Sequence, residues 1–513
     1  MTRYVWAIAL WAGLVPAASG QARSNYEELQ ILSGVLNHVR LNYVDSVTYG
    51  DMVRAAVAGL LRSLDPHSHY FSRAEFERRS ALERGELGTI GVHIEIVDGR
   101  ATVASVMSGG PAAERGVQAG DRLVAIDDTS VAGLDASGVT LRLAGRDGSH
   151  VRLELERGPR LEPRPVRARV RRTRRDPALV PVAEMVDDST GYVVLVEFGT
   201  GAAQELERAV RRLEGRRMRR LILDLRQNPG GRVVESVDIA SLFFPRNTVV
   251  FRVDGRKSDL QEEFTTSRDG RFRNLPLVVL VDEGSASASE ALAASLQDHD
   301  RAVLIGRRSF GKALMQIPLI LQNGDVVQLT VGRIFSPSGR LIQRRYQGVT
   351  VEQYRAFAGR GGAAEDTVDL YRTTGGRTVR GGGGVVPDLE VLVHDSLPPW
   401  FAVAADSGFD LQVADSVAHT LPAAPDGAWA WRDNAQAATL DAFLSVVGGR
   451  LGVRSEPSPT ERRAMAARLM SRAALVRWGR EVWQRLMLAG DPDVQAAREA
   501  LSRLPALLAA PGN

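Results

Sequence analysis

The sequence predicts a multidomain α/β protein, and three observations support this class. The chain has 513 residues with a hydrophobic content of 44%, which is enough to furnish several domain cores. Between residues 192 and 305, apolar runs of strand length alternate with helical patterns, as they do in an α/β core. Before and after this region, residues 26–84 and 400–513 show the apolar spacing of helices. We therefore expect helical segments toward both ends of the chain and an α/β core between them.

The first 22 residues have the order of a secretory signal peptide. Arg3 precedes an apolar stretch over 4–15, and a proline and small residues follow it. We expect cleavage near Gly20 or Ala22 and export to the periplasm or cell envelope. An uncleaved anchor is the alternative, although the stretch is shorter than the ~18 to 20 apolar residues that a membrane span needs.

The amino-acid composition excludes some kinds of catalytic chemistry and some classes of binding partner. The chain has no cysteine, which excludes disulfides, thiol catalysis and cysteine-ligated zinc. The net charge of +4 is small for this length, but arginines are dense over 152–175. Their alternation favours a solvated strand, and contact with an anionic membrane surface is the alternative. We expect no nucleic-acid partner for an exported protein.

A β-rich domain is expected over residues 85–157, after the N-terminal helical domain of 26–84. Alternating strands surround the run 110–128, in which a short helix and a Gly-Asp turn precede the strand Arg122–Ile126. This run resembles a bacterial PDZ domain. The resemblance implies a loop whose backbone amides hold the C-terminus of a peptide that adds to the sheet edge. The loop residues would be Thr89, Ile90, Gly91 and Val92. A small β domain that binds nothing is the alternative.

The α/β core is expected over residues 160–395. Its predicted elements are strand Tyr192–Phe198, helix Ala202–Glu214, strands Arg220–Leu225, Thr248–Val253 and Leu277–Val281, helix Ser289–Leu296 and strand Ala302–Ile305. A hairpin follows, because Asn323-Gly324 between two apolar runs suits a type I′ turn. A polar, glycine-rich insertion at 346–380 interrupts the core, and residues 400–513 form a mostly helical region.

A serine-rich turn follows the strand Leu277–Val281, which is apolar throughout and should be buried. Ser287 falls where the next helix begins. A hydroxyl there would lie on a rigid turn, with free helix N–H groups beside any negative charge that develops. Serine is also a common N-cap residue, so the position alone is ambiguous. Spacing alone does not choose among Ser285, Ser287 and Ser289.

Lys312 is one of only two lysines among 65 Lys and Arg residues. Arginine has a pKa above roughly 12, so it cannot replace lysine as a base near neutral pH. Lys257 lies in a polar stretch and is assigned no role, and none of the eight histidines lies in a recognisable triad context. Burial among apolar neighbours would lower the pKa of Lys312 and favour the neutral amine that activates a serine. Gln316 could orient that amine by hydrogen bonding.

A Pro-Gly-Gly turn at 228–231 ends a buried strand, and such a turn can bring exposed N–H groups close to a substrate. It completes an ordered set of motifs: Tyr43-Val-Asp45, Leu64-Asp-Pro-His-Ser68, the PDZ run, Asp224-Leu-Arg-Gln-Asn-Pro-Gly-Gly231, Gly284 to Glu290, Phe310-Gly-Lys312 with Gln316, Ser336 to Gln343, and Val386-Pro-Asp388. In this order the motifs resemble those of the carboxyl-terminal processing peptidases, also called tail-specific proteases. The resemblance covers residues 37–388.

The resemblance implies an exported serine endopeptidase with a ClpP/crotonase-like core and a Ser-Lys catalytic dyad. It assigns Ser287 as the nucleophile, Lys312 as the base and Gln316 as the residue that supports the base. The backbone amides of Gly231 and Ala288 would form the oxyanion hole. The PDZ domain would capture the C-terminal tail of the substrate, and cleavage would occur near that terminus.

The implied partners are polypeptides with free, apolar C-termini. The resemblance also leaves open an adaptor protein and a homo-oligomer formed through the C-terminal helices. The charge leaves open association with a membrane surface. We expect neither a metal nor a cofactor.

One PDZ turn departs from the family pattern. The family often has Arg-Gly-x-x-Gly-Thr there, whereas this chain has Ala144-Gly-Arg-Asp-Gly-Ser149. If the family's arginine couples the PDZ domain to the peptidase core, Arg142 or Arg146 must replace it.

Three other interpretations of the sequence compete with that of a Ser-Lys peptidase. The segment 306–313 is one residue short of a P-loop, but Ala313 cannot ligate magnesium and Pro318 would break the helix that should follow. Ser309 and Lys312 fit the Ser-x-x-Lys of penicillin-interacting enzymes, with Ser309 as the nucleophile, but no Lys-Thr-Gly partner is present. The third is a non-catalytic, PDZ-containing adaptor that binds peptides.

Overall fold

The computed structural model divides the chain into two compact units, residues 1–64 and 65–513. The described residues are 25–509 except 98, 107–109, 119, 135, 158–163, 175–177, 350–353, 355–368, 392–396, 399, 402–403, 405–408, 422–427 and 454–455. The predicted signal peptide, residues 1–22, lies outside them. Among the described helices, none combines the length and apolar character needed to cross a membrane.

Within its described residues, 25–64, the first unit contains two helices, α1 (Asn25–Asn42) and α2 (Tyr49–Leu64). The sequence predicts α3 (Arg73–Glu83) as part of the same N-terminal helical domain of 26–84, but α3 belongs to the second unit. The physical reason is the short strand before it. This strand, β1 (His69–Phe71), pairs antiparallel with β16 (Val326–Phe335) of the core.

The PDZ region forms a sheet in the order β2-β3-β4-β6-β7, with β5 paired to β4. Its elements are β2 (Val92–Val97), β3 (Arg100–Val106), α4 (Pro111–Glu114), β4 (Arg122–Ile126), β5 (Thr129–Ser130), α5 (Ala136–Leu143), β6 (His150–Arg157) and β7 (Arg164–Arg171). The strand predicted at 122–126 is confirmed with the same bounds.

The arginine-rich segment is the outer strand of this sheet. β7 pairs along its whole length with β6, so the sheet extends past the predicted domain boundary at residue 157. Ala168 and Val170 point into the domain core, whereas Arg167 and Arg169 are exposed. The predicted solvated strand is therefore confirmed, and its apolar face explains why it stays with the PDZ region rather than the core.

The core is built on a six-stranded sheet in the order β19-β14-β13-β10-β9-β8. The strands are β8 (Val182–Met185), β9 (Thr190–Val194), β10 (Arg220–Asp224), β13 (Leu277–Val281), β14 (Val303–Gly306) and β19 (Leu389–Glu390). β8 and β9 pair antiparallel, and the other neighbours pair parallel. The carboxyl ends of the parallel strands therefore meet at one edge, where α/β proteins place their sites.

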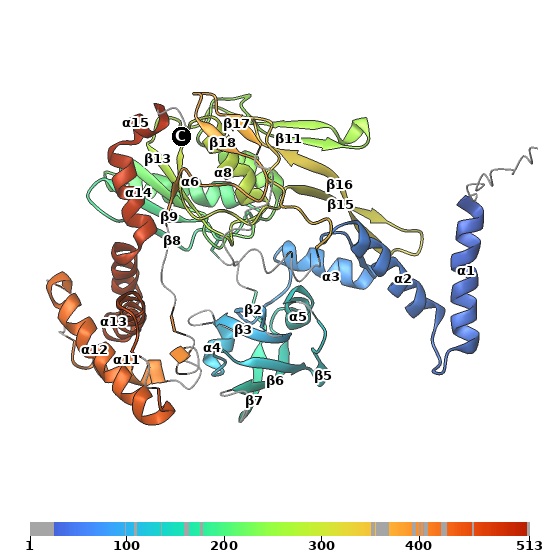
Figure 1. Cartoon of the computed structure of the whole chain (residues 1–513), viewed down its shortest axis with the longest axis horizontal. Helices are drawn as coiled ribbons and strands as arrows, with labels where there is room; N and C mark the ends of the chain where they lie inside the picture. Colours follow the sequence, from blue (N-terminus) through green and yellow to red (C-terminus); the bar gives the residue numbers. More distant parts are fainter. Residues whose placement is uncertain are drawn as a thin grey trace, which may run out of the picture. The chain divides into compact units, whose positions relative to one another are not determined.

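Helices cover both faces of this sheet. One face packs with α6 (Ala202–Gly215), α7 (Val233–Ala240) and α8 (Ala288–Asp298) in a single hydrophobic cluster. The other face packs with α14 (Pro492–Ser502) and α15 (Leu504–Ala509), and Figure 1 shows α14 alongside β13. Since both faces are buried, β13 is apolar at every position, as a parallel strand covered on both sides should be.

A second sheet carries the hairpin of β15 (Leu314–Ile320) and β16, together with β11 (Val249–Gly255) and β12 (Glu262–Thr265). A short 3-10 turn, Ser258–Leu260, joins β11 to β12. The predicted hairpin is confirmed, but the type I′ turn is wrong. Gly324 has φ +85° while Asn323 keeps a negative φ, and the Leu321 amide donates to the Asp325 carbonyl across a three-residue loop. A loop of that length needs one left-handed residue rather than two.

The C-terminal region is helical, as predicted. It contains α11 (Phe409–Ala418), α12 (Ala428–Leu451) and α13 (Pro459–Gly490), which share a core that includes Phe443 and Leu469. In the insertion at 346–380, β17 (Leu370–Arg372) and β18 (Thr378–Arg380) pair as a hairpin, and Tyr354 is buried.

Candidate active site

Ser287 occupies the N-cap of α8, directly after the turn that follows β13. Its φ is +57° and its ψ is −113°, a conformation that costs energy for a residue with a side chain. Ser285 and Ser289 are fully buried, and their hydroxyls donate to the carbonyls of Leu225 (2.8 Å) and Asn228 (2.9 Å). Of the three serines, Ser287 is thus the accessible one, with its neighbours used to hold the turn.

The Pro-Gly-Gly turn packs directly against the Ser287 turn. The Ala286 amide donates to the Asn228 carbonyl at 3.0 Å, and the Gly230 amide donates to Oδ1 of Asn228 at 2.9 Å. A Cβ on Gly230, which has φ +97°, would lie 2.6 Å from the Ala286 oxygen and 2.9 Å from Cβ of Ser287. Only glycine permits this approach.

The two amides predicted as oxyanion donors lie on these adjoining turns. Gly231 has φ +137°, and Ala288 is the first residue of α8. In the part of the chain that the structure describes, neither amide donates a hydrogen bond. Such unpaired N–H groups can bind a developing negative charge, which is what an oxyanion hole requires.

Glu290 joins the Ser287 turn to the segment that carries Lys312. Its side chain is 0% exposed. Oε2 accepts from the Ser287 amide at 2.9 Å and from the Lys312 amide at 2.8 Å. Oε1 accepts from the Gly311 amide at 2.7 Å and from the Ser309 hydroxyl. Burial raises the pKa of Glu290, and these four hydrogen bonds oppose the shift.

Sequence reasoning assigned no role to Glu290, although a local signal existed. Ser287 and Glu290 have the Ser-x-x-Glu spacing of a capping box, in which the glutamate accepts from the N-cap amide. That pattern predicts the bond to Ser287. It does not predict the bonds to residues 309–312, which depend on the tertiary fold.

Lys312 lies between β14 and β15. Burial lowers the pKa of its amine, and the positive charge of Arg79 lowers the pKa further, while Glu290 and Asp65 act in the opposite direction. The direction agrees with the prediction from its apolar neighbours. Arg79, on α3, is a second contributor that the sequence did not reveal, because it lies far from Lys312 in the chain.

Gln316 lies on β15, four residues after Lys312. Its amide donates to the Leu314 carbonyl at 3.1 Å and to Oγ1 of Thr330 at 3.3 Å. Within the described residues it makes no hydrogen bond to Lys312, so its support of the base stays a prediction.

A polar network contacts the chain at Ala313, the residue after Lys312. Gln343 accepts from the Ala313 amide at 2.7 Å and donates to the hydroxyl of Tyr354 at 3.1 Å. His67 contacts the same hydroxyl at 3.1 Å. Burial raises the pKa of Tyr354 to about 12. Tyr354 therefore ties the insertion to the Lys312 segment, a role that its polar, glycine-rich surroundings did not suggest.

Two competing interpretations of Lys312 do not fit the fold. The segment after Lys312 is the strand β15, not the helix that a P-loop requires. Ser309 is 1% exposed, and its hydroxyl donates to Glu290 and accepts from the Val385 amide at 2.7 Å. A hydroxyl held in this way is unsuited to attack a substrate.

The PDZ loop lies beside an open strand edge. β2 is the outer strand of its sheet, and α5 packs next to it. Gly91 has φ +74°, the Ile90 side chain is buried, and Val92 begins β2. The Thr89 amide donates to the Thr173 carbonyl at 3.1 Å, so it is already engaged.

The two arginines proposed as coupling residues remain within the PDZ region. Arg142 donates to the Ser130 carbonyl at 3.0 Å, and Arg146 is exposed. Arg172 is buried instead. It packs against the turn at 144–149, which departs from the family pattern, and donates to the Leu143 carbonyl at 2.7 Å. Arg78 on α3 donates to the Ala144 carbonyl at 2.7 Å, which links this turn to the helix that carries Arg79.

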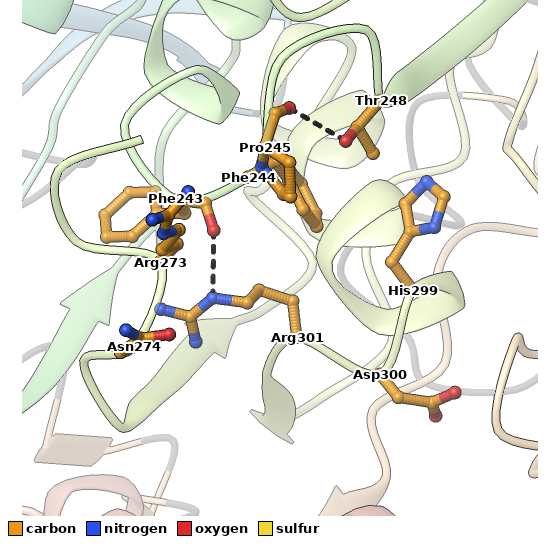
Figure 2. Close-up of a pocket in the computed structure, with 9 residues that line it drawn as sticks. All are labelled: Phe243, Phe244, Pro245, Thr248, Arg273, Asn274, His299, Asp300 and Arg301. Carbon is orange, nitrogen blue, oxygen red and sulfur yellow. Dashed lines mark hydrogen bonds between the residues drawn. The ribbon is translucent and has the colours of Figure 1, made fainter. Parts of the chain in front are cut away.

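A cavity of about 360 Å³ lies elsewhere in the core and contains none of the predicted site residues. Its lining residues, drawn in Figure 2, are Phe243, Phe244, Pro245, Thr248, Arg273, Asn274, His299, Asp300 and Arg301. Arg301 donates to three backbone carbonyls, and the His299 ring contacts the Val249 carbonyl at 2.7 Å. We assign this cavity no function.

Two family models match the chain, peptidase family S41 over residues 189–353 and the PDZ domain over residues 88–163. A carboxy-terminal-processing protease of Bartonella bacilliformis is 29% identical over 348 residues, which are 66% of this chain and 79% of that protein. A carboxyl-terminal-processing protease of Synechocystis is 34% identical over 290 residues, 55% of this chain and 66% of that protein. A protein of the same name from Picosynechococcus is 32% identical over 295 residues, 56% of this chain and 69% of that protein. With its S41 core and PDZ region, the chain belongs to the carboxyl-terminal processing protease family of serine peptidases.

Proposed function

We propose that this protein is an exported serine endopeptidase that cleaves polypeptides near their C-termini, with Ser287 as nucleophile and Lys312 as general base. The observation that carries the proposal is the shared acceptor Glu290, which fixes the backbones of Ser287 and Lys312 to one carboxylate oxygen. A nucleophile and its base must be held in a fixed geometry for proton transfer to be efficient.

The proposed reaction proceeds through an acyl-enzyme. Neutral Lys312 accepts the proton of the Ser287 hydroxyl as Oγ attacks the scissile carbonyl carbon, and the carbonyl oxygen becomes an oxyanion. The amides of Gly231 and Ala288 donate to that oxyanion. Protonated Lys312 then gives its proton to the leaving amine, and the C–N bond breaks. Water, deprotonated by Lys312, hydrolyses the Ser287 ester and regenerates the free hydroxyl.

The PDZ region supplies the selection of substrate termini in this proposal. The open edge of β2 can accept an added strand, and the loop of residues 90–92 offers backbone amides to a terminal carboxylate. Thr89 is the weakest of the four predicted loop residues for this role, because its amide is already bonded to Thr173.

The test compares wild type, Ser287→Ala and Ser309→Ala on unfolded peptides with apolar C-termini, each in a free and an amidated form. We expect Ser287→Ala to lose roughly 10³-fold or more in kcat, by analogy with the removal of triad residues. Full activity of Ser287→Ala, or loss of activity only in Ser309→Ala, would overturn the mechanism. Equal cleavage of free and amidated tails would instead remove carboxylate capture from the proposal.

Export is the part of the proposal that rests on the first 22 residues and their signal-peptide order. N-terminal sequencing of the protein from an envelope fraction should find a mature chain that starts near residues 21–23. A full-length chain confined to the cytoplasm would contradict export without affecting the proposed chemistry.

A further inference from the structure

Helix α14, which precedes α15 near the end of the chain, brings two carboxylates to the edge of the sheet where the candidate site lies. Its apolar face, including Val494 and Leu501, packs on the face of the sheet opposite α8. Asp491 caps the helix, accepting from the amides of residues 493 and 494, and Asp493 follows in the first turn. These two side chains are therefore held at the ends of the strands that carry the catalytic turns.

Both carboxylates bind Arg226, which lies five residues before Gly231. Arg226 donates from Nη2 to Oδ2 of Asp491 at 2.7 Å and from Nη1 to Oδ2 of Asp493 at 2.8 Å. It also donates from Nη2 to Asp224, two residues earlier, at 2.7 Å. Three carboxylates thus surround one guanidinium, whose planar donors fix its orientation.

Asp493 also reaches the segment that carries Lys312. The same oxygen, Oδ2, accepts from Nη1 of Arg307 at 3.3 Å, and Arg307 lies five residues before Lys312. Arg307 donates in turn to Glu283 at 3.0 Å, in the turn before Ser287. The Asp493 side chain is 2% exposed, so solvent screens these ion pairs little.

We propose that Asp491 and Asp493 are positioning residues for the reaction, which hold the Gly231 turn through Arg226 and the Lys312 segment through Arg307. Neither carboxylate touches the reacting atoms. The inference rests on the proposed function, and it gives α14 a part in catalysis. α14 lies well beyond residue 353, where the match to the S41 family model ends.

The test uses the full chain with Asp491→Asn and Asp493→Asn. Asparagine at 491 keeps the helix cap, because Asn is as good an N-cap residue as Asp, and removes only the charge that faces Arg226. Arg498→Gln is the matched control: it breaks another ion pair of α14, with Asp187 at 3.1 Å, that has no link to the catalytic turns. kcat and KM are measured on a cleavable peptide, and hydrogen exchange is followed at the amides within 226–231 that donate hydrogen bonds, those of residues 226, 227, 228 and 230.

We expect both Asp variants to lower kcat by roughly 10- to 100-fold, with KM within about twofold of wild type, because the turns shift rather than the substrate-binding surface. Exchange at 226–231 should be about tenfold faster, while exchange in β7 stays unchanged. Arg498→Gln should match wild type in all of these measurements. If Asp493→Asn does not fold, Asp491→Asn decides, since Asp491 is partly exposed.

Two results would overturn the positioning role: exchange at 226–231 as slow in Asp491→Asn as in Arg498→Gln, or an unchanged kcat. Faster exchange throughout the protein with kcat retained would show a merely structural role. Failure of the proposed function is distinguishable, because it would appear as full activity in Ser287→Ala. If wild type cleaves no peptide, the exchange measurement alone decides the positioning role.

Discussion

The backbone amides of Ser287 and Lys312 donate to the same oxygen, Oε2 of Glu290, at 2.9 and 2.8 Å. The two residues lie 25 positions apart in the chain, and one fully buried carboxylate joins their segments. Because the donors are backbone groups on turns, Glu290 sets the separation of the two backbones. The geometry of the site therefore depends on this carboxylate as much as on the hydroxyl and the amine.

Glu290→Gln should lower kcat by about 10²-fold, because the amide would place an N–H group against the donors that now converge on the carboxylate. The free energy of unfolding should fall by ~1 to 3 kcal/mol, since buried donors lose their acceptor. Glu235→Gln is the control: this buried carboxylate accepts from the amides of Gly201 and Ala203, at the start of α6. Glu235→Gln should lose a comparable amount of stability but keep the kcat of wild type. An equal kcat in Glu290→Gln and Glu235→Gln would count against the role of Glu290.

Arg79→Gln should move the acidic limb of the pH–activity profile to higher pH. Arg79 lowers the pKa of Lys312, so its removal raises that pKa. At any pH on this limb a smaller fraction of the amine is then neutral, and only the neutral amine can accept the serine proton. The measurement is the profile of kcat/KM against pH.

Arg73→Gln serves as the control for Arg79, because Arg73 is exposed on the same helix and pairs with Glu77. Its profile should coincide with that of wild type. A limb that stays in place in Arg79→Gln, or moves to lower pH, would contradict the electrostatic role of Arg79.

Gly230→Ala should abolish most activity, with a loss of about 10²-fold or more in kcat, because the new Cβ would push against Ala286 and Ser287. Gly339→Ala is the control, because it introduces backbone strain without a new steric contact. Gly339 also has a positive φ, of +85°, but a Cβ there meets nothing within 4 Å. It should cost only ~1 to 3 kcal/mol of stability and leave kcat intact. Similar kcat values for the two variants would argue against close packing of the two turns.

Much of the fold is predictable from local signals. The strands at 122–126 and 277–281 have the predicted bounds, because an apolar or alternating run next to glycine-rich turns is a short-range pattern. The boundary after residue 157 is wrong because β7 is polar on one face and apolar on the other. Its charged residues predict a solvated strand, which the predicted bounds place in the core at 160–395, whereas its apolar face completes the PDZ core.

The groups around the predicted site residues could not be predicted in the same way. Arg79 and Tyr354 approach the Lys312 segment from parts of the chain far away in sequence, and no local pattern indicates either contact. The apolar spacing of α14 predicts that one of its faces is buried, but not that it covers the core sheet or that Asp493 bonds Arg226. Such contacts depend on topology, which periodicity does not specify.

We propose that Ser287 is a nucleophile activated by the neutral amine of Lys312. The most direct measurement is reaction with a fluorophosphonate, which modifies activated serines, followed by mass mapping of the modified residue. Wild type and Ser309→Ala should each carry one adduct, on Ser287. Lys312→Arg keeps a positive charge but cannot supply a neutral base near pH 7, so it should carry none. An adduct on Ser309, or labelling of Ser287 at the wild-type rate in Lys312→Arg, would contradict the account.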